Sequence, residues 1–160
     1  MTTLVPSHGL MKIPPAPAPG ATLVLVDDNP HGLIARRTVL EELGYVVHTC
    51  QSGDEALKVL GSNKVDLVIT DFRMPNMDGV ELITRLREQR SDLPIILLSG
   101  FVEPLGLTEK STGADVVLSK SAGEVGLLVR SVRRLLNRQP PRKPLESERV
   151  PSSKAARNIG

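Results

Sequence analysis

Residues 68–79 read VITDFRMPNMDG, where a short apolar run ends on a single acid, Asp71, and a turn follows. The run is rich in branched residues and too short for a helix, so it predicts a buried strand over residues 65–70. A carboxylate at the end of a buried strand is costly to desolvate unless it pairs with a cation or binds a metal ion. The stretch therefore predicts that groups of complementary charge end at the same edge of a sheet.

Strand and helix patterns alternate on both sides of this stretch. Apolar runs predict strands at residues 22–27, 45–50, 65–70, 94–99 and 114–120. Helical spacing and capping residues predict helices at residues 30–43, 53–60, 79–90, 104–112 and 123–137, the fourth weakened by Gly106. Five such units joined by right-handed crossovers predict an α/β fold, with a parallel sheet covered by helices on both faces.

The composition suits one domain between two proline-rich ends. Of the 160 residues, 40% are hydrophobic but only 2% aromatic, so the core must be built from aliphatic side chains, as in parallel sheets. Prolines predict a disordered leader over residues 1–20 and a basic tail or linker over residues 138–160, leaving residues 21–137 as the folded domain. The excess positive charge lies in the tail, so it does not indicate a nucleic-acid-binding fold.

A cytoplasmic location is the expectation from the remaining composition. The single cysteine, Cys50, cannot form an intrachain disulfide, which suits a reducing compartment. No apolar run reaches the ~18 residues that would span a bilayer. The start of the chain lacks the long apolar segment of a signal peptide.

Charged and polar residues collect where the predicted strands end. Asp27 and Asp28 follow the first strand, Asp71 ends the third, Ser99 ends the fourth and Lys120 follows the fifth. In open α/β sheets, ligands bind beyond the carboxyl ends of the strands. Three acids would repel one another there, and a divalent cation with hard oxygen ligands, such as Mg²⁺, would relieve the conflict. The sequence therefore predicts a magnesium site at this edge.

Such a site suits phosphoryl transfer to a carboxylate. An aspartate held in line with a phosphorylated donor can attack phosphorus and form an aspartyl phosphate. Mg²⁺ and Lys120 would neutralise charge on the transferring oxygens, and Ser99 could donate a hydrogen bond to the new phosphoryl group. Asp71 is the predicted nucleophile.

Four motifs in this order resemble the receiver domain of response regulators in two-component signalling. They are VLVDDNP (24–30), TDFRMPNMDG (70–79), LLSG (97–100) and VLSK (117–120), and they cover about residues 21–137. The resemblance implies a flavodoxin-like, doubly wound (βα)5 three-layer sandwich with the parallel strand order 2-1-3-4-5.

The resemblance also implies residue roles and partners. Asp71 would accept phosphate from a histidine kinase or a histidine phosphotransfer protein, and the domain would then switch its binding to a downstream protein target. The implied metal ligands are Asp28 directly, Asp27 mainly through water, Asp71 and the backbone carbonyl of Arg73. Ser99 and Lys120 take the hydroxyl and lysine roles of the family, while Asp78 and Gly79 are structural.

Two departures from the family pattern concern output. Val117 stands where the family often has a switching aromatic, and Ser121 where it usually has a proline. The phosphorylation chemistry survives these changes, but the usual coupling between hydroxyl and aromatic does not. Arg73 and Phe101 occupy the positions that tune dephosphorylation in the family.

We therefore expect a signalling switch rather than an enzyme, with only self-catalysed phosphoryl transfer and hydrolysis. A non-phosphorylated interaction module is the alternative. A phosphatase on a related fold is disfavoured because the first two acids are adjacent rather than in a DxD pattern. No DNA-binding domain fits into residues 138–160, so the chain is expected to be a stand-alone receiver or the receiver end of a larger kinase. The resemblance leaves room for a homodimer on phosphorylation.

Overall fold

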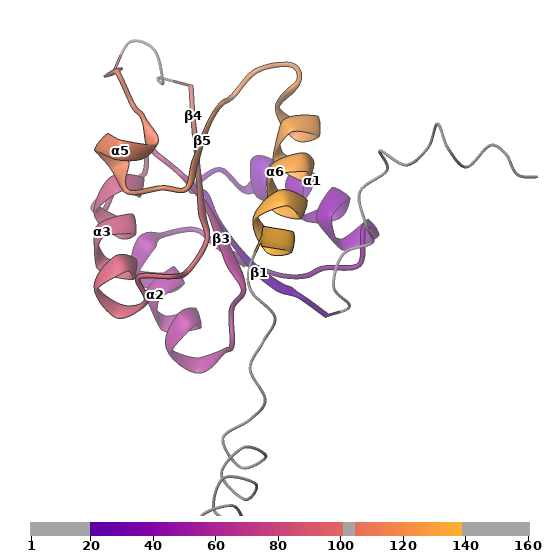
Figure 1. Cartoon of the computed structure of the whole chain (residues 1–160), viewed down its shortest axis with the longest axis horizontal. Helices are drawn as coiled ribbons and strands as arrows, with labels where there is room; N and C mark the ends of the chain where they lie inside the picture. Colours follow the sequence, from indigo (N-terminus) through magenta and orange to yellow (C-terminus); the bar gives the residue numbers. More distant parts are fainter. Residues whose placement is uncertain (1–19, 101–104, 139–160) are drawn as a thin grey trace, which may run out of the picture.

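The computed structural model describes residues 20–100 and 105–138, and these form five strands with helices between them (Figure 1). The strands are β1 (Thr22–Val26), β2 (Val46–Cys50), β3 (Leu67–Asp71), β4 (Ile95–Ser99) and β5 (Val116–Ser119). The helices are α1 (Pro30–Glu42), α2 (Gly53–Ser62), α3 (Gly79–Gln89), α5 (Glu109–Thr112) and α6 (Glu124–Arg138). Phe101 lies outside the described residues, and so do the predicted leader and the predicted tail except for residues 20 and 138.

The five strands form one parallel sheet in the order β2-β1-β3-β4-β5, which confirms the predicted topology. Helices α1 and α6 cover one face, and α2, α3 and α5 cover the other (Figure 1). The order of strands reverses next to β1, since the chain moves from β1 outward to β2 and then back to β3. The carboxyl ends of β1 and β3 therefore border a crevice suited to a ligand.

Period-two alternation along the strands explains the three layers. Leu23 and Leu25 of β1 pack in the core beneath α1 and α6, whereas Val24 and Val26 pack in the core beneath α2 and α3. Successive side chains of a strand point to opposite faces of a sheet, so each strand supplies both cores. Strands β3 and β4 are buried along their whole length. This double burial accounts for the continuous apolar runs seen in the sequence.

Capping residues set the helix ends close to their predicted positions. Asn29 caps α1, and Pro30 follows at the first helical position. Ser52 caps α2 by accepting the N–H of Glu55 at 3.1 Å, while the Glu55 side chain returns to the N–H of Gln51. Gly44, with φ of 100°, follows the end of α1, as glycine commonly does.

The helix predicted over residues 104–112 is shorter in the structure. Among its described residues, position 105 is helical, the helix is interrupted over residues 106–108, and α5 begins after its cap Thr108 and ends before Gly113, whose φ is 84°. Gly106 also has a positive φ, of 64°, which interrupts any helix running through it. Within residues 20–100 and 105–138, no helix is long and apolar enough to cross a membrane.

Candidate functional site

The parallel register brings the predicted site residues to one edge of the sheet. Asp27 follows β1, and its N–H donates to the carbonyl of Cys50 at 3.0 Å. Asp71 is the last residue of β3 and pairs with Leu98 of β4. Lys120 follows β5, and its N–H donates to the carbonyl of Ser99 at 2.9 Å. Backbone hydrogen bonds of the sheet thus fix where these side chains start.

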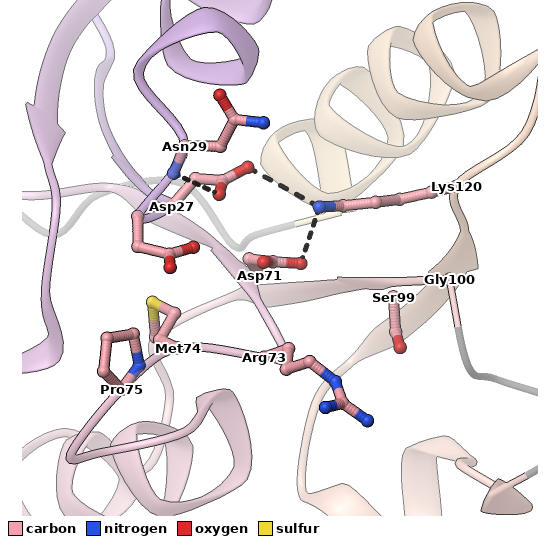
Figure 2. A pocket seen from close by; sticks show the side chains of 10 residues that line it. Asp27, Asn29, Asp71, Arg73, Met74, Pro75, Ser99, Gly100 and Lys120 are labelled. Carbon is pink, nitrogen blue, oxygen red and sulfur yellow. Dashed lines mark hydrogen bonds and ion pairs between the residues drawn. The ribbon is translucent and has the colours of Figure 1, made fainter.

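Three carboxylates come together in a pocket at this edge. Oxygen atoms of Asp27, Asp28 and Asp71 all lie within 4.8 Å of one another. The pocket has a volume of about 520 Å³ and includes Lys120 and Ser99 in its lining (Figure 2). Asp27 and Asp71 are buried, whereas Asp28 is exposed. Three close carboxylates with one open side fit a divalent metal ion that keeps some of its water.

Lys120 is the cation that the lone strand-end carboxylate requires. Its ammonium lies 2.7 Å from an oxygen of Asp71 and 3.6 Å from one of Asp27 (Figure 2). Burial raises the pKa of the Asp71 carboxyl above its ordinary value. The bond and charge of Lys120 oppose that shift, and the charge of Asp27 adds to it. Asp71 therefore sits in a site where a negative charge is under-compensated by the protein alone.

Asp27 has a second cationic partner that the sequence did not reveal. The Arg36 guanidinium lies 3.0 Å from Asp27 Oδ2, and its Nε donates to Glu124 at the start of α6. Arg36 and Glu124 are both buried, with 8% of each residue exposed. Burial alone would lower the pKa of Arg36, but the contacts with Glu124 and Asp27 outweigh it, so the pKa is raised and the group stays charged.

The turn after Asp71 depends on a close backbone approach. The N–H of Gly79 donates to the carbonyl of Phe72 at 2.7 Å. A Cβ on Gly79 would lie 2.4 Å from the carbonyl oxygen of Asp71. Asp78 caps α3 by accepting the N–H of Glu81 at 2.9 Å, which agrees with the structural role predicted for it. The turn thus holds α3 tightly against the end of β3.

The remaining predicted site residues line the same pocket in different orientations. The side chain of Arg73 extends away from the acids, as expected if only its backbone carbonyl faces the site (Figure 2). Ser99 lines the pocket, but its hydroxyl points away from Lys120 in this view (Figure 2). Val117 is half-buried in β5 and packs against the core under α3.

The family comparison agrees with this geometry. The family model described as response regulator receiver domain matches residues 23–132, most of the described chain. That match runs from the second residue of β1 into α6 and includes the three acids.

Curated relatives with similar sequences include transcriptional regulatory proteins. The chain is 35% identical over 118 residues to the alkaline phosphatase synthesis transcriptional regulatory protein PhoP of Bacillus subtilis, covering 70% of the chain and 48% of that protein. It is 44% identical over 79 residues to the transcriptional regulatory protein GlrR of Escherichia coli, covering 49% of the chain and 18% of that protein. The chain thus spans about half or less of the length of these relatives.

Solved structures show the same fold. The response regulator protein TrrA of Thermotoga maritima, in complex with Mg²⁺ and BeF, is 33% identical with a TM-score of 0.66, over 72% of this chain and 99% of that one. The chemotaxis response regulator CheY4 of Vibrio cholerae is 30% identical with a TM-score of 0.66, over 73% of this chain and 99% of that one.

Proposed function

This chain belongs to the response regulator receiver domain family, and from that premise we propose that Asp71 is its phosphoacceptor and that Mg²⁺ is the metal at Asp27, Asp28 and Asp71. The observation that carries the proposal is the convergence of three carboxylates and Lys120 in one pocket. TrrA, a structural neighbour, was solved with Mg²⁺ and BeF. The backbone carbonyl of Arg73 is proposed as a further ligand.

The proposed reaction transfers a phosphoryl group from a phosphohistidine to Asp71. An oxygen of the Asp71 carboxylate attacks phosphorus, the phosphorus–nitrogen bond of the donor breaks, and the leaving imidazole takes up a proton from solvent. A bound Mg²⁺ supplies charge neutralisation for the phosphoryl oxygens. Lys120, which bonds to Asp71 before transfer, is placed to bond to a phosphoryl oxygen afterwards. Ser99, which lines the same pocket, is proposed to donate a hydrogen bond to this group.

Phosphorylation is proposed to change which partner the domain binds. Receiver domains interact with histidine kinases and with downstream targets, and a cytoplasmic location fits such a kinase partner. The phosphoryl group would shift a pre-existing equilibrium between two states of the surface near β4 and β5. Val117 cannot act as a switching aromatic, so another contact must connect the site with that surface.

The non-phosphorylated interaction module is not favoured. Such a module has no need to bury Asp27 and Asp71 beside one another, because their repulsion only costs stability. The arrangement is useful when a cation and a phosphoryl group are to be bound. A switch of this kind requires only two chemical steps, transfer of the phosphoryl group to Asp71 and slow hydrolysis of the aspartyl phosphate.

Intact mass measurement tests the proposal. The full chain is incubated with Mg²⁺ and acetyl phosphate or phosphoramidate, with EDTA in a parallel sample. A gain of one phosphoryl group is expected with Mg²⁺, and none with EDTA or in Asp71→Asn. Asp78→Asn is the matched control, since it removes an acid that caps α3 outside the cluster, and it should still be phosphorylated. An adduct that persists in Asp71→Asn would refute the assignment.

A further inference from the structure

Arg36 is a buried cation that the proposed phosphoryl transfer does not use. It lies on α1, and its guanidinium contacts Asp27 of the acid cluster and Glu124 of α6. Both Arg36 pairs belong to the acid cluster or its direct partners, as do the pairs of Lys120 with Asp27 and Asp71. By contrast, the Arg37–Glu41 and Arg85–Glu81 pairs are exposed. Surface pairs of the latter kind contribute little.

The chain is built to accommodate this arginine. Gly32 lies one helical turn before Arg36, and a Cβ there would be 2.9 Å from Arg36 Nη1 and 3.0 Å from Asp27 Oδ2. A larger residue would therefore press on both partners of the ion pair. Asp27 Oδ1 accepts the N–H of Asn29 at 2.9 Å, so both oxygens of Asp27 have donors from α1 or its start. Asp27 is consequently held in one orientation before any metal binds.

The charges around Asp27 oppose one another. Arg36 reduces the negative potential of the acid cluster, because its guanidinium is in contact with one of the three carboxylates. Glu124 counters that effect, because its carboxylate pairs with Nε of the same guanidinium. Two helices flank the site in Figure 2, and the Arg36–Glu124 hydrogen bond joins the second turn of α1 to the start of α6.

We propose that Arg36 lowers the affinity of the acid cluster for a divalent cation by competing with the cation for Asp27, and that Glu124, which pairs with the same guanidinium, limits this competition. The inference rests on the proposed function, since it takes the three acids as the metal site. It also gives that site a direct mechanical connection to α6, which does not pass through Ser99 or Val117.

Opposite effects of two substitutions form the test. Arg36→Met removes the competing cation and should tighten Mg²⁺ binding roughly three- to tenfold, the size expected for one charge near a divalent ion in a partly solvated cleft. Glu124→Gln removes the negative charge that partly neutralises Arg36, so the full charge of Arg36 acts on Asp27. This variant should weaken Mg²⁺ binding by a similar factor. A merely structural tie between α1 and α6 would not move the two affinities in opposite directions.

The measurement is calorimetric titration of the full chain with MgCl₂, with no phosphodonor present. Arg36→Met leaves Glu124 buried without its partner and could unfold, so the double variant Arg36→Met/Glu124→Gln is included, with an affinity expected between those of Arg36→Met and the wild type. Arg37→Met is the matched control, because it removes the same charge from the next position of α1 at an exposed pair. Its affinity should stay within about twofold of the wild type.

The possible results separate the two proposals. If the wild type binds Mg²⁺ and both Arg36→Met and Glu124→Gln weaken binding or leave it unchanged, the role of Arg36 is refuted and the proposed function stands. A double variant that binds more weakly than the wild type would also refute it. If the wild type does not bind Mg²⁺, both proposals are overturned together.

Discussion

Replacing Gly79 by alanine should damage both the stability of the domain and the geometry of Asp71. The new Cβ would lie 2.4 Å from the carbonyl oxygen of Asp71, 2.8 Å from Leu97 Cδ1 and 3.0 Å from the Cα of Phe72. Two of these three atoms belong to the backbone at the end of β3, so the clash cannot be relieved by rotating a side chain. Overpacking of a well-packed site costs about 1–3 kcal/mol, and the upper part of this range is expected here.

Gly61→Ala is the matched control for this substitution. Gly61 lies in α2, its φ is not positive, and a Cβ there would meet nothing within 4 Å. The same chemical change should therefore stabilise the domain by roughly 0.5–1 kcal/mol through helix propensity alone.

Urea denaturation followed by circular dichroism measures both variants. The midpoint should fall for Gly79→Ala and rise for Gly61→Ala, at similar slopes. Phosphorylation of Gly79→Ala by acetyl phosphate should also slow, because the clash displaces the residue that carries the nucleophile. A Gly79→Ala protein as stable as the wild type, alongside a stabilised Gly61→Ala protein, would refute the close approach.

Three further predictions concern charge and reactivity. Asp71→Asn should raise the free energy of unfolding by roughly 0.5–2 kcal/mol at neutral pH in EDTA. Because burial raises the folded-state pKa of Asp71 above the ordinary 3.8, the protonated carboxyl stabilises the folded state fully below pH 3.8, and this stabilisation is lost as the pH rises through the folded-state pKa. A variant that is less stable than the wild type in urea denaturation would contradict this. Burial raises the pKa of the Cys50 thiol to about 12, so the folded protein should react with a chromogenic disulfide far more slowly than the urea-unfolded protein at mildly alkaline pH, and equal rates would contradict the burial. Arg87→Met should lower the free energy of unfolding by about 2–3 kcal/mol, because Arg87 donates hydrogen bonds to Asp115 and to the carbonyls of Ser91, Leu93 and Gly113. Arg85→Met is the control, because it breaks only an exposed pair with Glu81, and it should lower this free energy by at most about 0.5 kcal/mol. Thermal or urea denaturation measures both variants.

The sheet and most of the site were predictable because they depend on local patterns. Apolar runs with period-two alternation place the strands, and parallel strands necessarily bring their carboxyl ends to one edge. Asp27, Asp28, Asp71 and Lys120 therefore meet in the structure as the sequence predicts. The roles of these residues in binding Mg²⁺ and phosphate remain predictions.

Element ends were less predictable, because tertiary hydrogen bonds decide them. Strand β3 starts at Leu67 rather than at residue 65, since the side chain of Asp66 accepts the N–H of Thr22 at 2.8 Å. The helix predicted before β5 is interrupted because Gly106 takes a positive φ, whereas its predicted end at residue 112 agrees with the end of α5. Neither effect follows from apolar periodicity.

Arg36 was missed because Glu124, one of its two acidic partners, is distant in the sequence. It occupies a position on the buried face of α1, between Leu33 and Leu40, where helical spacing alone marks an anomaly. Such an arginine must either reach solvent or find an acid, and that acid, Glu124, lies 88 residues away. The available signal was a charged residue at an apolar position of the helix. An acid with no assigned role later in the chain was its candidate partner.

Locating the phosphoryl group chemically tests the central proposal most directly. The full chain is phosphorylated with acetyl phosphate in Mg²⁺, reduced with borohydride, which converts an acyl phosphate of aspartate to homoserine, and digested for peptide sequencing by mass spectrometry. Homoserine should appear at position 71, only in the sample with Mg²⁺, and not in the Asp71→Asn protein. Homoserine at Asp27, Asp28 or any other aspartate, or none at position 71 in a sample that binds Mg²⁺, would contradict the assignment of Asp71 as the phosphoacceptor.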